Sequence, residues 1–146
     1  MRNRTKKAFT LVEILIVVVI LGILAAIVVP QFTNATQDAQ QGNLRAQIKS
    51  LQNQIELFKA RTNNYPTMAE MTGNPATTSE TNGWGALIDG GYIKKAPHNP
   101  AAPAADQCKV SAAGGAGFGW EYVVATGTLG ATYYNEANDQ LTPGVP

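Results

Sequence analysis

Glu13 is the residue best placed to do chemistry in this chain, because it is the one carboxylate within a long apolar run. Between Ile14 and Val29 there are 16 consecutive residues without a charged or strongly polar side chain, and Phe9 to Leu11 extend the run across Glu13. A charged side chain in an apolar helix costs about 2.5 kcal/mol or more, so it needs a cationic or hydrogen-bonding partner. The alternative is an interfacial glutamate whose carboxylate reaches the lipid headgroups. The chemistry predicted for Glu13 is therefore charge pairing.

The other reactive side chains do not form a catalytic pattern. One cysteine excludes a disulfide within the chain, and one cysteine with one histidine excludes the usual zinc sites, so any metal ion would need oxygen ligands. His98 lies in a proline-rich loop without a nucleophile arrangement, and Cys108 beside Lys109 is interpreted as an isolated thiol. Lys94 and Lys95 form too small a basic patch for nucleic acid. We predict no catalytic residue and no nucleic-acid partner.

A basic leader and a helix of membrane length must position Glu13. Four of the 11 basic residues lie in the first seven positions, directly before the apolar run. As a helix, Phe9 to Val29 spans about 30 Å, the thickness of a bilayer core. The positive flank predicts a cytoplasmic N-terminus, with the bulk of the chain outside. A cleaved secretory signal is the alternative, but the run is longer than a usual signal core and lacks a polar cleavage region.

An amphipathic helix is expected after Pro30. Gly22 and Pro30 predict a kink or a locally melted stretch in the apolar part. Beyond it, five apolar residues recur at spacings of 4, 3, 4 and 3: Leu44, Ile48, Leu51, Ile55 and Phe58. Such a short stripe favours packing on its own domain over a free coiled coil. Asn63 to Pro66 should end the helix.

The remaining residues, 65–146, are rich in glycine, proline, threonine and asparagine and are predicted to be mostly loops. Two strands are expected, at 120–126 and 128–134, with a turn near Gly127. Alternation places Trp120, Tyr122 and Val124 on one face, which can pack on the helical stripe. The predicted head is a small antiparallel sheet clasped to a helix.

The stretch KKAFTLVEILIVVVILGILAAIVVPQF resembles the N-terminus of the type IV pilin and type II secretion pseudopilin superfamily. The resemblance implies that a membrane peptidase cuts between Ala8 and Phe9 and methylates the new amine of Phe9; the family usually has Gly where Ala8 stands. It also implies that Glu13 pairs with the terminal amine of a neighbouring subunit. Gly22 and Pro30 would bracket a segment that unwinds on filament assembly.

A second, looser resemblance concerns NNYPT and the segment from Tyr92 to Pro100, which are similar to the head of the major, G-type pseudopilin. That subunit often binds calcium in its C-terminal loop. Carried over, the resemblance would make Glu136, Asn138 and Asp139 an oxygen cluster for a hard cation. Their spacing matches no defined calcium motif, and a polar tail is usually only solvated. We therefore expect no cofactor, with calcium as the alternative.

These predictions together describe a type IV pilin-like α+β protein with a leader (1–8), a transmembrane and assembly helix (9–30), an amphipathic helix (31–64) and an extracytoplasmic head (65–146). It is expected to be a structural subunit of a type II secretion pseudopilus in the bacterial inner membrane. The partners implied are other copies of the chain, a prepilin peptidase, an assembly platform with a separate ATPase, and minor pseudopilins. A surface type IV pilin and, further off, a membrane-anchored binding module are the alternatives.

Overall fold

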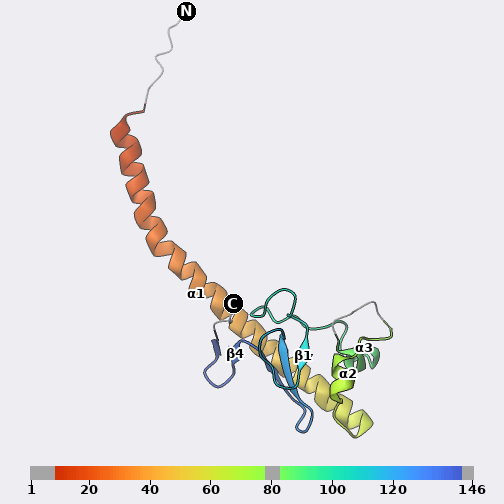
Figure 1. Ribbon diagram of the computed structural model, residues 1–146. Helices are drawn as coiled ribbons and strands as arrows, with labels where there is room; N and C mark the ends of the chain where they lie inside the picture. The colour runs from red at the N-terminus through yellow and green to blue at the C-terminus, as the bar shows by residue number, and fades with distance from the viewer. Residues whose placement is uncertain (1–8, 78–82, 143–146) are drawn as a thin grey trace, which may run out of the picture. The chain divides into compact units, whose positions relative to one another are not determined.

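The computed structural model describes residues 9–77 and 83–142, and only the backbone of residues 30–34. The chain divides into two units, residues 1–37 and 38–146, which are described separately. The elements, drawn in Figure 1, are three helices and five short strands: α1 (Leu11–Thr62), α2 (Met68–Thr72), α3 (Gly85–Asp89), β1 (Val110–Ser111), β2 (Trp120–Val123), β3 (Thr128–Ala131), β4 (Tyr134–Asn135) and β5 (Gln140–Leu141).

The first unit is helical from Leu11 onward, and α1 continues without interruption past Gly22 and Pro30. The locally melted stretch expected between these two residues is therefore absent from this structure. Glycine and proline are tolerated inside helices of membrane length. A Cβ added to Gly22 would meet nothing within 4 Å, so no contact in this chain requires glycine there. Unwinding on assembly remains a prediction.

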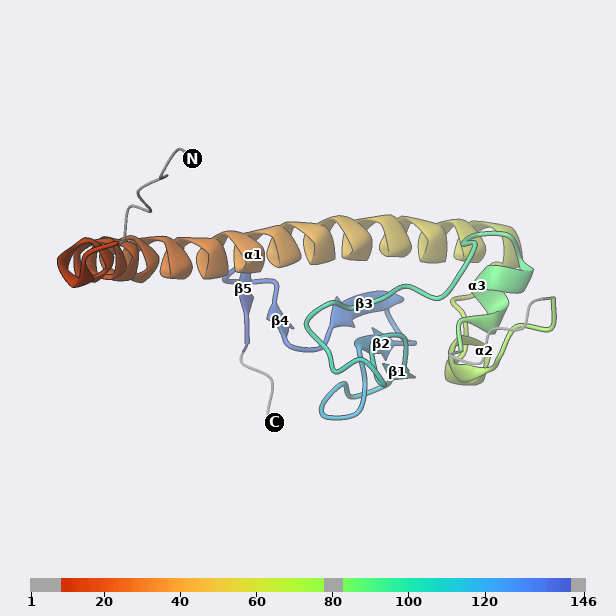
Figure 2. The same ribbon diagram turned by 90° about the horizontal axis from the view of Figure 1, so that it is seen from above.

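The core of the second unit is built on the predicted helical stripe, and its five members are all buried: Leu44, Ile48, Leu51, Ile55 and Phe58. They form one cluster with residues of the head, among them Trp84, Trp120, Tyr122 and Leu129. Figure 2 shows the short helices and the sheets on one side of this part of α1. The stripe thus packs on its own domain, as its length predicted.

The main sheet is mixed, which corrects the purely antiparallel sheet predicted from the sequence. β2 and β3 pair antiparallel, with Trp120 opposite Ala131, but β1 pairs parallel to β2. The strands are also shorter than expected, and Val124 lies outside β2 with 37% of its surface exposed, so only Trp120 and Tyr122 face the core. β4 and β5 form a separate two-stranded antiparallel hairpin.

Two local features close the head around α1. The helix ends at Thr62, followed by Asn63 in the left-handed conformation (φ 63°), and the N–H of Asn63 donates to Lys59 O (2.8 Å). The turn between β2 and β3 contains Gly127 at φ 70°, and a Cβ there would collide with the ring of Tyr65. Glycine is therefore required at this turn by both its backbone and its neighbour.

Candidate assembly site

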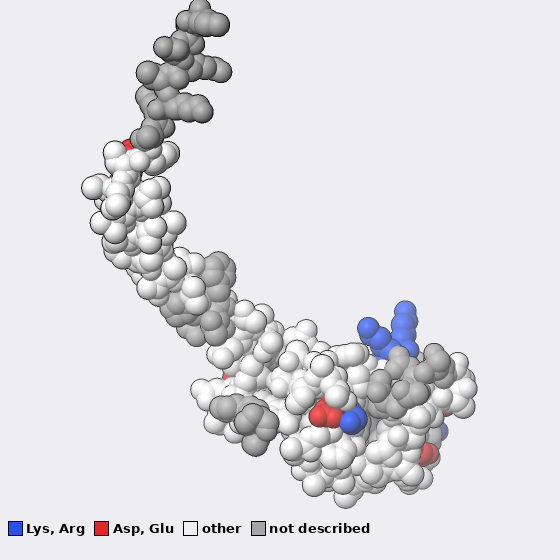
Figure 3. Space-filling model, turned by 45° about the horizontal axis from the view of Figure 1, so that its top comes forward, with Lys and Arg blue, Asp and Glu red and all other residues white. Residues whose placement is uncertain are grey.

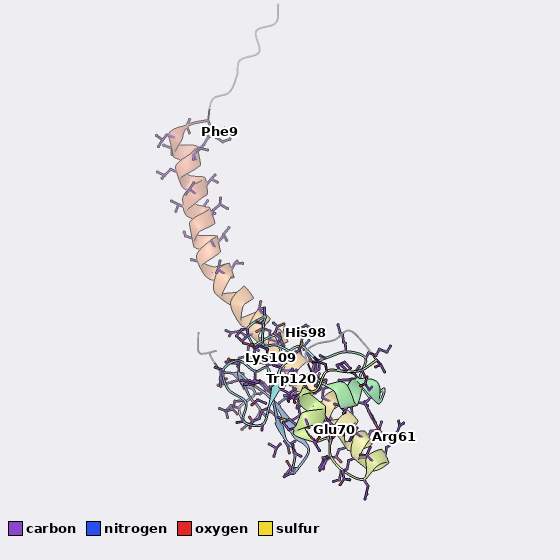
Figure 4. The ribbon with its side chains drawn as sticks, turned by 45° about the vertical axis from the view of Figure 1, so that its right-hand side comes forward. Phe9, Arg61, Glu70, His98, Lys109 and Trp120 are labelled. Atoms are coloured by element: carbon purple, nitrogen blue, oxygen red, sulfur yellow. The ribbon has the colours of Figure 1, made fainter. Side chains whose placement is uncertain are left out.

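The first part of α1 presents an apolar surface on every side. Residues Leu11–Val29 form the one described helical stretch long and apolar enough to cross a membrane, and none of it is buried within the chain. The side chains in this stretch project all around the helix in Figure 4, and its surface is almost entirely uncharged in Figure 3. Burying a side chain such as Leu or Ile is worth about 1.5–3 kcal/mol, so this surface needs a lipid or protein environment.

Glu13 forms a reciprocal capping box with Thr10 at the beginning of α1. The backbone N–H and the hydroxyl of Thr10 both donate to Glu13 Oε2 (2.9 Å each). The N–H of Glu13 in turn donates to Thr10 Oγ1 (3.2 Å). This pattern satisfies donors that a helix N-terminus otherwise leaves unpaired. The carboxylate is thus held on the first turn of the helix.

Thr10 is a residue of this site that our sequence reasoning missed. The signal was present, because a threonine three residues before a glutamate at the beginning of an apolar run is the signature of a capping box. Phe9 directly precedes it and is 76% exposed (Figure 4). Ala8, on the other side of the predicted cleavage point, lies outside the described residues.

The C-terminal residues predicted to bind calcium do not converge on one point. Asp139 Oδ2 lies 3.1 Å from the guanidinium of Arg45 on α1, and its Oδ1 accepts a hydrogen bond from the hydroxyl of Tyr134. Glu136 instead lies near Gly130 on β3, 3.6 Å from the position that a Cβ would take there. Within residues 9–77 and 83–142, no group of three or more His, Cys, Asp or Glu side chains could hold a metal ion.

The pKa of the Glu136 carboxyl is shifted by burial and not by a charged neighbour. Partial burial raises the pKa of its carboxyl above the usual 4.5, with no opposing charge as a cause. Its surroundings are a shallow groove of about 310 Å³ that is also lined by Arg45, Lys49 and Tyr134. Asn138 is exposed, and its backbone N–H donates to Asn135 Oδ1 (3.3 Å). Calcium binding therefore remains a prediction that these side chains, as placed, do not favour.

The remaining reactive side chains, those of His98, Cys108 and Lys109, each have different surroundings. His98 is exposed and its Nδ1 is 3.3 Å from Gln107 Oε1. Cys108 is buried in the core, whereas the neighbouring Lys109 donates to Asp106 Oδ1 (2.7 Å). The sequence predicted Cys108 only as an isolated thiol in a loop; the structure adds that its side chain belongs to the buried core. His98 and Lys109 are labelled in Figure 4.

Two protein-family models match consecutive parts of the chain. Residues 3–29 match the prokaryotic N-terminal methylation motif. Residues 31–105 match type II secretion system protein G, which is half of the chain. The second match ends before β1, so the C-terminal sheets and the calcium candidates lie outside it. No solved structure matches the chain.

The chain is also similar to curated proteins named type II secretion system core protein G. That of Aeromonas hydrophila is 36% identical over 104 residues, 68% of this chain and 71% of the relative. Those of Vibrio cholerae and Pseudomonas aeruginosa are 36% and 35% identical, covering 68% of this chain and 68% and 71% of the relatives. These names favour the secretion pseudopilin over the surface pilin considered above. By its matched domain and its identity to these relatives, the chain belongs to the type II secretion protein G family.

Proposed function

We propose that the chain is the major structural subunit of a type II secretion pseudopilus. It is inserted in the inner membrane with its N-terminus in the cytoplasm, cut between Ala8 and Phe9, and methylated on the new amine of Phe9. It then polymerises through the first part of α1. The match of residues 3–29 to the methylation motif supports the processing steps.

The observation that carries this proposal is the exposed apolar helix Leu11–Val29. A helix that is apolar all round must be covered by lipid or by other protein. In the membrane the bilayer covers it, and in a filament the same helices of neighbouring copies do so. A repeated interface of this kind that does not close produces an open helical polymer.

Glu13 is proposed to set the register of that polymer. Cleavage before Phe9 creates a positive amine close to the depth of Glu13, and the carboxylate of one subunit pairs with the amine of the next. A misplaced subunit would leave both charges unpaired in apolar surroundings, which is far more costly than the pair. The capping box holds the carboxylate on the first helical turn until that partner arrives.

The role is structural and needs partners that supply enzymes and energy. A prepilin peptidase, an inner-membrane assembly platform, a separate ATPase and minor pseudopilins are the partners proposed. His98 is exposed beside Gln107, whereas Cys108 is buried in the core of the head. Replacing both together should leave assembly and protein level unchanged.

The first test is the intact mass of the protein extracted from membranes of its host. A mass equal to residues 9–146 plus one methyl group is expected. Retention of residues 1–8 would contradict processing and point to a membrane-anchored module. Loss of the whole apolar run would point to a secreted protein.

The second test separates the charge of Glu13 from its capping role. Glu13→Gln keeps an oxygen for the Thr10 donors, because glutamine also serves at this position of a capping box. It removes the charge, so we expect normal membrane insertion but no filaments, as for Glu13→Leu. Glu56→Gln, at an exposed position in the second half of α1, is the control and should assemble normally. Normal filament yield from Glu13→Gln would contradict the register role of the charge.

A further inference from the structure

The hairpin of β4 and β5 is too small to hold itself in place. Each strand has two residues, with Tyr134 opposite Leu141 and Asn135 opposite Gln140. Even longer two-stranded hairpins are only marginally stable in water. Tyr134 is buried and Leu141 packs against the core, which fixes the base of the hairpin. Within the loop from Glu136 to Asp139, the N–H groups of Ala137 and Asn138 donate to Asn135 Oδ1, which shapes the loop but does not attach it to α1. The hairpin lies beside α1, so an attachment to that helix would fasten it (Figure 2).

Asp139 provides such an attachment, because both of its carboxylate oxygens are already engaged. Oδ2 lies 3.1 Å from the guanidinium of Arg45, and Oδ1 accepts from the hydroxyl of Tyr134. The backbone of Asp139 is in the left-handed conformation (φ 53°), which aspartate and asparagine tolerate better than most residues. One side chain thus joins the loop, its own first strand and the helix.

This arrangement is a poor fit for calcium. A calcium ion takes six to eight oxygen ligands, several of them usually carboxylates. Here a cation would have to displace the positive guanidinium of Arg45 from Asp139, and Glu136 would have to leave its place beside β3. The tail also lies beyond residues 31–105, where the chain matches the protein G family model, so the match itself carries no ligand to these positions.

We propose that Arg45, Asp139 and Tyr134 form a metal-free clamp that fastens the C-terminal hairpin to α1, in place of a calcium ion. The clamp makes the folding of the head independent of calcium. It concerns the second unit of the chain alone, so it holds or fails independently of the filament role proposed above. The side chain of Arg45 is 67% exposed and that of Asp139 is 40% exposed, so the clamp is a local fastening of modest strength.

The experiment measures hydrogen exchange of peptides covering residues 134–142 in the full-length protein, purified in detergent. The wild type is compared in EDTA and in millimolar calcium chloride, and the same exchange rate is expected in both. Asp139→Asn removes the charge but keeps a side chain suited to the left-handed backbone. Both Asp139→Asn and Arg45→Gln should speed exchange of the tail about two- to fivefold, the range expected of an exposed ion pair.

The clamp also predicts coupling between the two charges. The double variant Arg45→Gln/Asp139→Asn should exchange no faster than either single variant, because each single change already removes the interaction. Lys49→Gln is the matched control, since Lys49 lines the same groove one turn further along α1 and forms no ion pair within the described residues. It should leave the exchange of the tail unchanged.

Three results would overturn the clamp. The first is slower exchange of the wild-type tail in calcium, abolished by Asp139→Asn, which would establish a metal site. The second is unchanged exchange in both single variants. The third is a double variant whose effect is the sum of the two. Filament formation is not read out here, so none of these results depends on the proposed function.

Discussion

One buried amide, that of Asn99, is predicted to hold the loops of the head together. Asn99 is fully buried, and its Nδ2 donates to the carbonyl oxygens of Gly119 (2.6 Å) and Thr132 (2.7 Å). Its Oδ1 accepts from the N–H of Ala101 (2.9 Å). The side chain therefore connects the loop before β1 with the beginning of β2 and the end of β3, which lie opposite each other at the same end of the pair. Asn99→Ala removes all three hydrogen bonds at once.

The size of the effect follows from which backbone groups lose their partners. The carbonyl of Gly119 keeps a hydrogen bond from the N–H of Thr132 (3.0 Å), so its loss is small. The carbonyl of Thr132 and the N–H of Ala101 lose the one hydrogen bond described for each. An unpaired buried polar group costs about 1–3 kcal/mol. Both of these hydrogen bonds are only partly buried, so water can partly replace them, and we expect a total loss of about 2–4 kcal/mol. This is a large part of a typical stability of about 5–15 kcal/mol.

The assay is urea unfolding of the mature, full-length protein in detergent. Trp84 and Trp120 are both buried in the head, so their fluorescence reports its unfolding. Asn64→Ala is the control, because Asn64 is exposed and, within the described part of the chain, only its backbone carbonyl accepts a side-chain hydrogen bond. It should change the free energy of unfolding by no more than about 0.5 kcal/mol. A loss below about 1 kcal/mol for Asn99→Ala would show that the carbonyl of Thr132 and the N–H of Ala101 find other partners, and would refute the prediction.

Three further substitutions test the electrostatics of the head. The buried hydroxyl of Tyr122 donates to Pro66 O (2.9 Å), so Tyr122→Phe should lower the free energy of unfolding by about 1–3 kcal/mol in urea. Burial raises the pKa of Tyr122 from 10.0 to about 12, so the stability contributed by the protonated hydroxyl is present below pH 10 and is lost as the pH rises through 12. If Tyr122→Phe lost as much stability as the wild type over this alkaline range, the hydroxyl would not be the cause. The hydroxyl of Thr77 is the main cause that holds the pKa of Asp89 below its usual 3.8, so its contribution is present above that value and lost as the pH falls through the lower, folded pKa. In Asp89→Asn, the Tm should therefore fall less steeply than in the wild type as the pH is lowered. An equally steep fall would contradict a role for the Asp89 carboxylate. Partial burial raises the pKa of Glu136 above 4.5, so the stabilisation by its protonated form is present below 4.5 and lost as the pH rises through the folded pKa. Glu136→Gln should raise the Tm at neutral pH but not at acid pH, whereas a lower Tm at neutral pH would show that the ionised carboxylate has a favourable partner.

Features that depend on a regular sequence period could be predicted. The spacing of Leu44, Ile48, Leu51, Ile55 and Phe58 placed all five in the core, because one face of a helix is fixed by its own period. The alternation in β2 likewise placed Trp120 and Tyr122 inside. The parallel strand β1 had no such signal, since Val110–Ser111 is two residues long and depends on its neighbour for its conformation.

Features that depend on distant contacts could not be predicted in the same way. The resemblance to the G-type head included the segment around Asn99, but only the folded chain shows that its amide joins Gly119 and Thr132. The pairing of Arg45 with Asp139 joins the middle of α1 to the tail, and no local pattern relates them. Thr10 differs, because its relation to Glu13 is local and readable from the capping-box spacing.

The two halves of α1 differ in how far their surfaces determine the way in which each half packs. The half in the head has one apolar stripe, so a single face packs and the rotation of the helix is determined. The stretch Leu11–Val29 is apolar on all sides, and the hydrophobic effect has no direction, so burying it against copies of itself favours contact without choosing a rotation or an axial offset. Specific register in a filament must therefore come from the few groups that are not apolar and from small residues that allow close approach. In the described part of this stretch and its first turn, the polar groups are Thr10 and Glu13, and the small residues are Gly22, Ala25 and Ala26. Gly22→Ala has room in the isolated chain and should insert normally, so an assembly defect in that variant would locate a close contact between neighbouring helices.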